Sequence, residues 1–214
     1  MYLSKLILHT GSSQARKDIG NPHNLHRTIM RAFPSPLPEK ERVLFRIESF
    51  NLGSPPVVLV QSLIKPDWDN VEAKFKGYFA RKPETKPING LKVNQGDIFR
   101  FRLRANPSKR VFYKATGKNQ RISLFSEQDR RDWLARKAKV GGFSVIEDRL
   151  LVRDAPYRTI FISKEDETQK ATFNMVDFDG LLRVEEPEKF LENVRKGVGA
   201  AKGLGCGLLS FVRA

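Results

Sequence analysis

The order of its strand-like and helix-like segments is the feature that most restricts the fold of this chain. Residues 2–9 alternate in hydrophobicity as a strand does, and the segment that begins at Asn21 repeats apolar residues at helical spacing. Asn21 is a favourable N-cap, and proline at the next position suits the first turn of a helix. Two strand-like runs, a second helix and a strand at 98–105 follow. The order βαββαβ is that of a ferredoxin-like unit, which leaves one face of its sheet free for a ligand.

The second half of the chain nearly repeats this order. A helix at 127–139 precedes strands near 144–152, 158–163 and 171–184, then a helix at 187–196 and a strand at 207–212. With 214 residues, the chain is long enough for two small domains. We therefore predict an α+β protein with two tandem ferredoxin-like (RRM-like) domains, at residues 1–107 and 126–214, joined by a basic linker at 108–125.

The formal charge of the chain is +15, from 39 Lys and Arg against 24 Asp and Glu. An excess of this size on a folded protein favours a polyanionic partner, and nucleic acid is the first candidate. An acidic membrane surface is less favoured, because the chain has no long basic amphipathic helix and no apolar run of membrane-spanning length. The short apolar run at the N-terminus does not predict a signal peptide, and the single Cys206 excludes an internal disulfide. We expect a soluble, cytoplasmic protein.

The strand at 98–105 carries much of the basic charge. Its aromatic and aliphatic residues point one way, while Arg100, Arg102 and Arg104 point the other way. From Ile98 to Ser126 the sequence has eight basic residues and no acidic one. An ordinary solvated face would intersperse both signs, whereas a stripe of one sign is typical of a nucleic-acid surface. Arg104 is therefore a candidate RNA contact. The basic helix at 127–139 is either a second such surface or an ordinary surface helix.

A glycine-rich segment, GVGAAKGLGCGLL, occupies residues 197–209. It follows a helix and opens a strand, which is the reverse of a Rossmann fingerprint, and Lys202 is followed by glycine rather than by the Ser or Thr of a Walker A loop. We therefore expect no nucleotide cofactor. The segment is either a tight crossover or a loop whose backbone amides, with Lys202, approach a nucleic-acid backbone, and five glycines favour the second interpretation. The candidate contacts are Gly199, Lys202, Gly203 and Gly205.

Two of the three histidines, His23 and His26, lie one turn apart near the start of the first helix. The positive end of the helix dipole favours a neutral imidazole and attracts phosphate. A neutral imidazole beside a phosphate can remove the proton of a ribose 2′-OH, which then forms a 2′,3′-cyclic phosphate without any metal ion. An unremarkable surface histidine is the competing interpretation for His26. A metal site on this pair is weaker still, because no carboxylate or cysteine cluster lies near it in the sequence.

Five segments together resemble the CasE family, the CRISPR-associated endoribonucleases of type I-E systems. They are YLSKLIL at the start, NPHNLHR, RFRLRANPSKR, DWLARK and the terminal GVGAAKGLGCGLLS, so the resemblance spans the chain. It implies two tandem ferredoxin-like domains and cleavage of a CRISPR precursor RNA at the base of the repeat stem-loop. It also implies that the protein retains the mature crRNA and joins the other subunits of the Cascade complex.

The resemblance assigns the catalytic histidine to His26 and an RNA-contacting loop to residues 197–207. It also assigns basic stem contacts to Arg27, Arg130, Arg131, Lys164 and Lys170. One position departs from the family, because relatives commonly carry tyrosine where this chain has His23. We hypothesise that a second imidazole fills that role. A non-catalytic RNA-binding scaffold of a ribonucleoprotein complex is the alternative, since a basic surface and a glycine loop would serve it equally well.

Overall fold

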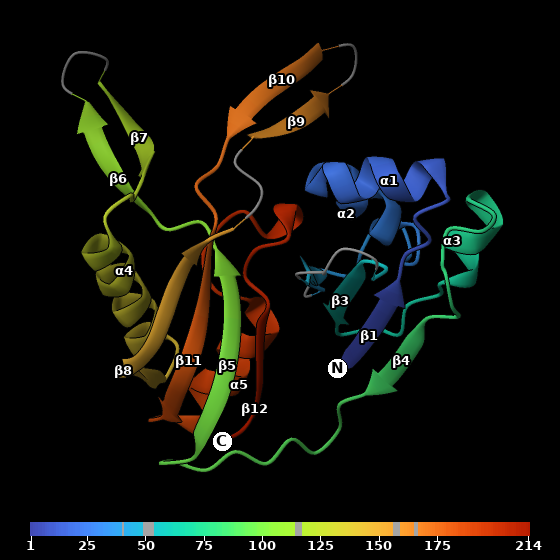
Figure 1. Cartoon of the computed structure of the whole chain (residues 1–214). Coiled ribbons are helices and arrows are strands. Elements are labelled where there is room, and N and C mark those ends of the chain that lie inside the picture. Colours follow the sequence, from blue (N-terminus) through green and yellow to red (C-terminus); the bar gives the residue numbers. More distant parts are fainter. Residues whose placement is uncertain (40, 49–53, 114–116, 156–158, 165–166) are drawn as a thin grey trace.

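The computed structural model describes residues 1–39, 41–48, 54–113, 117–155, 159–164 and 167–214, with the side chains of 113 and 159–172 left out. The described chain forms two α+β units that lie side by side, each built on a four-stranded antiparallel sheet (Figure 1). None of the described helices is long and apolar enough to cross a membrane.

The first sheet has the strand order β2-β3-β1-β4. Helices α1 and α2 follow β1, and the short α3 follows β3. Leu25 and Ile29 of α2 are buried in one apolar cluster with Leu6 and Val60 of the sheet, which fixes the direction of the remaining faces of α2. The elements of this unit are β1 (Tyr2–Ile7), α1 (Ser13–Gly20), α2 (Pro22–Met30), β2 (Leu44–Ile47), β3 (Val57–Ser62), α3 (Asp69–Lys74) and β4 (Glu84–Pro87).

The second sheet has the order β12-β5-β11-β8, with α4 and α5 packed on it through Trp133, Leu134 and Phe190. Two hairpins, β6–β7 and β9–β10, extend from the same end of this unit (Figure 1). Its elements are β5 (Ile98–Ala105), β6 (Ser108–Tyr113), β7 (Lys118–Ser123), α4 (Glu127–Val140), β8 (Phe143–Asp154), β9 (Thr159–Lys164), β10 (Glu167–Thr172), β11 (Val176–Val184), α5 (Pro187–Lys196), the one-turn 3₁₀ helix η1 (Lys202–Leu204) and β12 (Leu209–Arg213).

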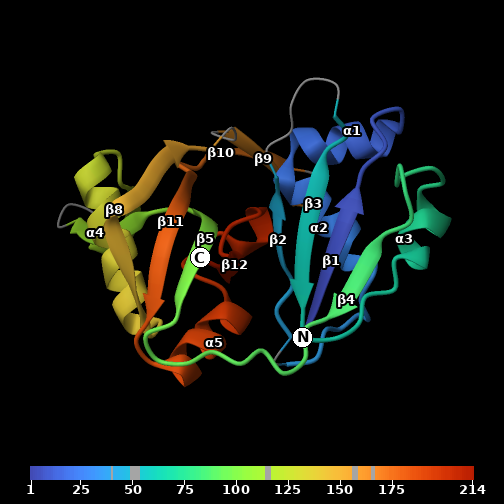
Figure 2. The same cartoon turned by 60° about the horizontal axis from the view of Figure 1, so that its bottom comes forward.

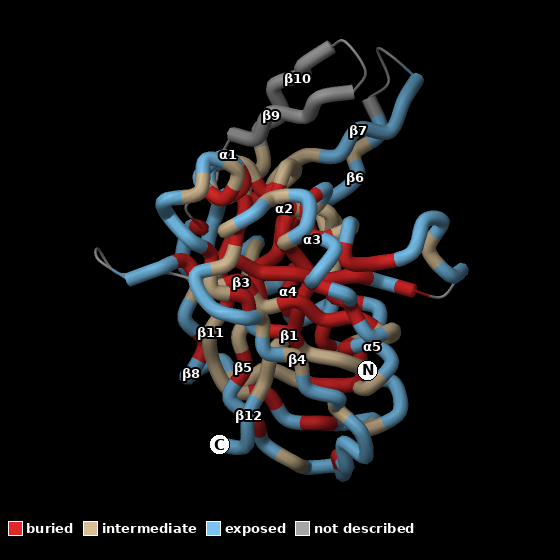
Figure 3. Tube along the Cα trace, turned by 90° about the vertical axis from the view of Figure 1, so that its right-hand side faces the viewer, coloured by how far each residue is buried: buried red, intermediate tan, exposed pale blue. Residues whose placement is uncertain are grey.

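Both sheets have the same connectivity when the strands of each unit are counted in chain order. The first strand (β1 or β5) lies in the middle of the sheet and pairs with the fourth and the third. The second strand pairs with the third. This is the strand order of the ferredoxin-like fold, so the predicted α+β class with two tandem βαββαβ units is confirmed. Buried residues concentrate in the two units, and the described part of β6–β7 is largely exposed (Figure 3).

Two expectations on domain limits need correction. The strand at 98–105 was expected to close the first unit, but β5 pairs with β11 and β12 of the second sheet. The polar β4 is the fourth strand of the first sheet. We therefore propose that the boundary lies between Pro87 and Ile98 rather than at residue 107. The expected linker at 108–125 instead contains the β6–β7 hairpin, because its alternating residues pair across the turn.

Buried polar side chains join the two units where β2 faces β5 and β12 (Figure 2). Arg46 of β2 donates to the carbonyl oxygens of Arg102 and Leu208, at 3.0 Å each, and to the hydroxyl of Ser210 at 2.7 Å. Its guanidinium also bonds Glu48 of its own unit. Gln61 donates to the carbonyl oxygen of Val194 at 2.8 Å. Because these bonds are shielded from water, they hold the units in a defined arrangement.

Candidate active site

His26 lies in α2, on the side of the helix that faces the glycine segment of the second unit. The helix begins where the Asn21 side chain accepts a hydrogen bond from the His23 backbone N–H at 3.1 Å, with Pro22 at the first helical position. Leu25 and Ile29 are buried in the core, and His26 is half-buried. The local sequence therefore fixes both the start of the helix and the direction of the histidine.

The imidazole of His26 is located between the two units. Its ring stacks on Phe45 of β2, with centroids 6.1 Å apart and planes at 27°. On the other side lies the glycine-rich segment of the second unit: a Cβ placed on Gly203 would be 3.7 Å from the nearest imidazole atoms. This is ordinary van der Waals distance. The histidine and the glycine loop, 177 positions apart (203 minus 26), thus meet at one site.

The electrostatics of the site favour an uncharged imidazole. Burial lowers the pKa of His26 below its ordinary value, and the nearby His23 lowers it further. A histidine with a lowered pKa is neutral at pH 7, so it can accept a proton from a substrate hydroxyl. The prediction of a neutral imidazole, made from the helix N-terminus, agrees in direction, although burial is the larger cause.

His23 is half-buried and shares the same environment. Burial lowers its pKa, and the cationic Arg27 one turn further along lowers it further. Its Nδ1 is buried without a hydrogen-bond partner among the described residues, and Arg27 is exposed. Within the described part of the chain, no group of three or more His, Cys, Asp or Glu side chains is placed to share a metal ion.

Part of the glycine segment forms a tight crossover, one of the two alternatives that the sequence left open. Gly199 and Gly205 have φ of +78° and +84°, and side chains there would press on Trp133 and Phe45, at 3.0 and 3.2 Å from their rings. These two glycines are explained by a tight crossover. Gly203, in contrast, leaves room for a Cβ at ordinary contact distance from His26. Lys202 donates to the carbonyl oxygen of Gly199 at 2.9 Å, and burial, with Arg42 and Lys137 nearby, lowers its pKa.

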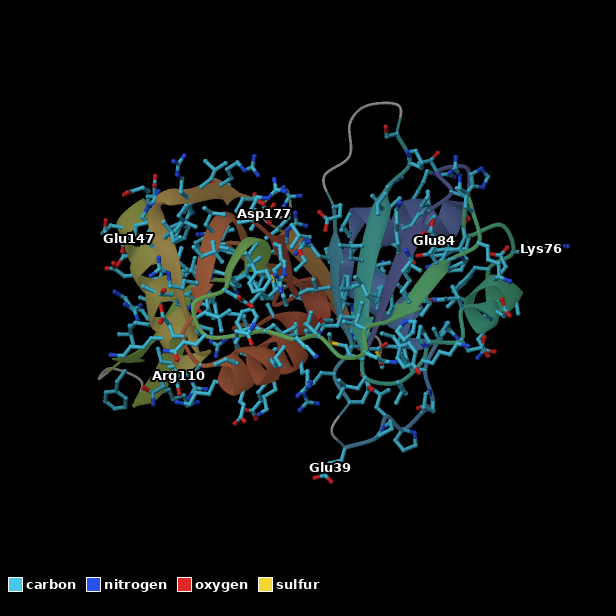
Figure 4. The ribbon with its side chains drawn as sticks, turned by 90° about the horizontal axis from the view of Figure 1, so that it is seen from below. Glu39, Lys76, Glu84, Arg110, Glu147 and Asp177 are labelled. Carbon is cyan, nitrogen blue, oxygen red and sulfur yellow. The ribbon has the colours of Figure 1, made fainter. Side chains whose placement is uncertain are left out.

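The expectation that Arg104 contacts RNA is wrong. Arg104 is 4% exposed, and its guanidinium forms two hydrogen bonds with the carboxylate of Asp177, at 2.7 and 2.8 Å. Arg102 likewise pairs with Asp179, which lies opposite it on β11. The acidic partners come from a strand about 75 positions away in sequence, so a count of charges along β5 alone could not find them. Asp177 is 9% exposed, and Figure 4 labels it among the side chains of the second unit.

The side chains predicted to contact the RNA stem differ in whether they form ion pairs within the protein. Arg130 pairs with Asp154 at 2.9 Å, and Arg131 pairs with Glu127 at 2.7 Å, one turn earlier in α4. Lys164 and Lys170 lie in β9 and β10, and their side chains lie outside the described residues. α2 contacts β9 through its backbone, so this hairpin lies next to the helix that carries His26.

Two residues of the site were not predicted from the sequence. Phe45, which supports the His26 ring, reads as one more apolar strand residue, and nothing in its surroundings marks it. Arg46 reads as a surface arginine in a strand, yet it is 2% exposed. An arginine within a run of buried apolar residues (VLFRI) is the one available signal that its charge is paired inside the protein.

Comparison with known proteins places the chain among CRISPR proteins. A family described as "CRISPR associated protein" matches residues 1–213. The CRISPR-associated endoribonuclease Cse3 of Thermus thermophilus is 37% identical, covering 98% of this chain and 99% of Cse3. The Cascade subunit CasE of Escherichia coli K12 is 30% identical, covering 99% of this chain and 98% of CasE.

Solved structures agree with this result. A structure of Cse3 bound to a 19-nucleotide RNA superposes with a TM-score of 0.84 at 37% identity, covering 99% of this chain and all of that one. Cas6e from Escherichia coli K-12 gives a TM-score of 0.71 at 27% identity, with both chains covered in full. The chain therefore belongs to the CRISPR-associated protein family that includes Cse3 and CasE.

Proposed function

We propose that this protein is an endoribonuclease that cuts CRISPR precursor RNA at the base of the repeat stem-loop, with His26 as the general base. The observation that carries the proposal is a half-buried imidazole, its pKa lowered by burial, that faces a glycine loop with no side chain at Gly203. The names of its relatives support RNA cleavage, since Cse3 is an endoribonuclease whose structures include one with an RNA representing a pre-cleavage complex.

The chemistry requires one proton to leave and another to arrive. His26 accepts the proton of the 2′-OH, and the 2′-oxygen forms a bond to the adjacent phosphorus. The bond from phosphorus to the 5′-oxygen breaks, and this oxygen takes up a proton from an acid or from water. The products are a 2′,3′-cyclic phosphate and a 5′-OH, and the route is independent of metal ions. Lys202 or Arg27 supplies positive charge to the transition state, worth on the order of several kcal/mol when preorganised.

His23 stands where relatives commonly have tyrosine, and its lowered pKa restricts its role. A neutral imidazole is a poor acid at pH 7, but its N–H can still donate a hydrogen bond to a phosphate oxygen. We therefore assign His23 to orienting the scissile phosphate rather than to protonating the leaving group. Arg27, Arg130, Arg131, Lys164 and Lys170, with the backbone of Gly199, Gly203 and Gly205, remain the proposed RNA contacts.

The protein then keeps its product and acts within a larger assembly. Many phosphate contacts survive the cut, so release of the mature crRNA is slow. Its relative CasE is a Cascade subunit, and we propose the same partners and a cytoplasmic location for this chain. A burst of one equivalent of product followed by near-silence is the expected time course, whereas brisk multiple turnover contradicts retention.

The deciding experiment is cleavage of the repeat RNA encoded beside this protein, in excess EDTA, with both ends mapped. We expect one cut with a cyclic phosphate end, and a loss of about 10²–10⁴-fold in the single-turnover rate for His26→Ala while RNA binding is kept. Full activity of His26→Ala would remove the proposed mechanism. Binding without any cleavage by the wild-type protein would select the scaffold alternative.

A further inference from the structure

Two imidazoles lie one turn apart on α2, but the proposed cut uses only one of them to move a proton. His23 and His26 are at positions i and i+3, whose side chains are neighbours on one face of a helix. The two rings are close enough for His23 to lower the pKa of His26. α2 also contacts η1, which carries Gly203, and β9 of the second unit (Figure 1). Two imidazoles beside one phosphate can transfer protons on both sides of its phosphorus, so the second ring is available for a further step.

After the cut, this pair holds one acid and one base. His26 then carries the proton that it took from the 2′-OH. His23 stays neutral, because the charges on His26 and on Arg27, both one turn further along the helix, disfavour a proton on it. Its Nδ1 is buried without a hydrogen-bond partner among the described residues, so an imidazolium at His23 would also hold a buried N–H without an acceptor. A protonated imidazole beside a neutral one is the state that a second acid–base step needs.

The cut also leaves a reactive RNA end beside the pair. The 2′,3′-cyclic phosphate stays on the retained RNA, and the fragment with the 5′-OH departs from the side of the phosphorus opposite the 2′-oxygen. We propose that the protein hydrolyses this cyclic phosphate to a 3′-phosphate, with His23 as the base and His26 as the acid. This inference rests on the proposed function for the position of His26 at the 2′-oxygen and for the retention of the product.

The second step adds one water molecule to the RNA. His23 removes a proton from a water at the position that the 5′-oxygen has left, and the water oxygen forms a bond to phosphorus. The bond from phosphorus to the 2′-oxygen breaks, and His26 returns its proton to that oxygen. The proton on His23 then passes to solvent. Because the pKa of His26 is lowered, little of it is protonated at neutral pH, so hydrolysis is slower than the cut and the cyclic end is the first product.

The other described charged groups near α2 do not supply this base. Arg27 is a cation, and Lys202 of η1 donates to the carbonyl oxygen of Gly199. Asp18 of α1, which packs against α2, is buried and accepts a hydrogen bond from the hydroxyl of Tyr78 at 2.7 Å. The side chains of β9 lie outside the described residues. Among the described groups named here, a neutral His23 is therefore the one that can take a proton from water.

The test supplies the product of the cut directly. A synthetic repeat stem-loop RNA that ends in a 2′,3′-cyclic phosphate is incubated with excess protein in EDTA, and mass spectrometry detects the gain of one water. We expect the wild-type protein to convert this end about tenfold or more faster than buffer alone. His23→Tyr keeps an O–H donor for the phosphate but removes the base, so conversion should fall to the buffer rate, as in His23→Ala. His9→Ala removes an exposed histidine of the same unit and is the matched control, with conversion at the wild-type rate. A cyclic end that the wild-type protein leaves intact, or equal conversion by both His23 variants, would overturn the inference.

The pH dependence of conversion identifies the roles of the two histidines. The cut needs a neutral His26, whereas hydrolysis needs a protonated His26, so conversion should fall as the pH rises through the pKa of His26, which is lowered from 6.5. Conversion should also fall at lower pH, where His23 takes up a proton. The expected profile is therefore a bell with its maximum below 6.5. A conversion rate that rises with pH as the cleavage rate does would contradict these roles.

The isomer that forms shows which bond breaks. Digestion of the RNA and chromatography of its terminal nucleotide should give a 3′-phosphate, because His26 protonates the 2′-oxygen. A 2′-phosphate would mean that the bond to the 3′-oxygen broke, which contradicts the assignment of His26 as the acid. Since the RNA already carries the cyclic end, a wild-type protein that converts it but never cuts the precursor would reject the proposed function alone. A protein that cuts the precursor and leaves the cyclic end would reject this inference alone.

Discussion

An imidazole accepts a proton at neutral pH only while it is uncharged, and at position 26 the protein favours this state by burial and by a neighbouring histidine. Phe45 limits the movement of the ring on one side, and Gly203, which has no side chain, lies on the other. A histidine with the same sequence context on an open surface would keep an ordinary pKa. The reactivity of His26 therefore depends on contacts from both units.

The pH dependence of cleavage follows from this environment. The single-turnover rate constant, measured with protein in excess over RNA, should fall at acid pH as His26 takes up a proton. The midpoint of this fall should lie below 6.5, because the pKa of His26 is lowered from that value. In His23→Ala the midpoint should move to higher pH, since a like charge and a covering group are both removed. Single-turnover rates from pH 4.5 to 8 give both midpoints. If His23→Ala leaves both the cleavage rate and the acidic and basic limbs of the pH–rate profile unchanged, His23 and His26 do not act as a functional pair.

At the scale of single residues, the sequence identified the histidines but not their setting. The i, i+3 spacing and the N-cap at Asn21 are local features, and the structure has both. Phe45 and Gly203 reach His26 only through the contact of two units, which no local pattern encodes. The error on Arg104 has the same origin, because its partner Asp177 lies on another strand.

The β5–β11 strand pair shows how charge inside a sheet is stabilised. Asp177→Ala would leave the guanidinium of Arg104 buried without its carboxylate partner, although it keeps the carbonyl oxygen of Ile47 at 2.9 Å. We expect a loss of about 3–5 kcal/mol in the free energy of unfolding, as is typical when one partner of a buried pair is removed. Asp179→Ala is the matched control: Arg102 is 41% exposed and keeps Glu48, so the loss should be about 1 kcal/mol or less. Urea unfolding measures both, and equal losses would argue against a buried pair.

The glycine segment can be divided by two single substitutions. Gly203→Ala places a methyl group at ordinary contact distance from His26, so stability should change by less than about 1 kcal/mol while cleavage falls, because the methyl group fills space beside the reacting groups. Gly205→Ala requires a side chain at φ +84°, 3.2 Å from Phe45, and should cost about 1–2 kcal/mol or more. Thermal unfolding and cleavage rates of the two variants separate these effects. Cleavage at the wild-type rate by Gly203→Ala would show that RNA does not approach this face of the loop.

At the scale of elements, periodicity predicted most strands and helices but not how they pair. The helix at 187–196 and the strand at 98–105 have the limits expected from the sequence. Short or polar elements were missed: α1 is eight residues long, and β4 (ETKP) has no apolar face to mark it. Because β4 escaped notice, β5 was assigned to the first unit, although its alternation fits either sheet equally well.

The two units make one site only while their relative position is fixed. His26 and Phe45 come from the first unit, and Gly203 and Lys202 come from the second. Arg46 donates hydrogen bonds across this boundary to two backbone carbonyl oxygens. One of these oxygens lies in β5 and the other just before β12. A substrate strand that must contact both units therefore depends on a side chain that is buried between them.

Replacing Arg46 tests this dependence. Arg46→Met keeps the bulk of the side chain but leaves the carbonyl oxygens of Arg102 and Leu208 without their donor, so the contact between the units should weaken by on the order of 3 kcal/mol. The two tryptophans report on the units separately, since Trp68 lies in the first core and Trp133 in the second. Each of the variants Trp68→Phe and Trp133→Phe keeps one tryptophan, so its fluorescence reports on one unit. The urea midpoints of the two units should coincide when residue 46 is arginine. They should differ in Arg46→Met, with cleavage reduced in parallel. Arg100→Met is the matched control, because Arg100 is exposed on β5 and lines the same surface hollow as Arg46, and its midpoints should still coincide. Coincident midpoints in Arg46→Met would mean that the remaining contacts between the units, which include the hydrogen bonds of Gln61 to Val194 and of Arg104 to Ile47, suffice without this arginine.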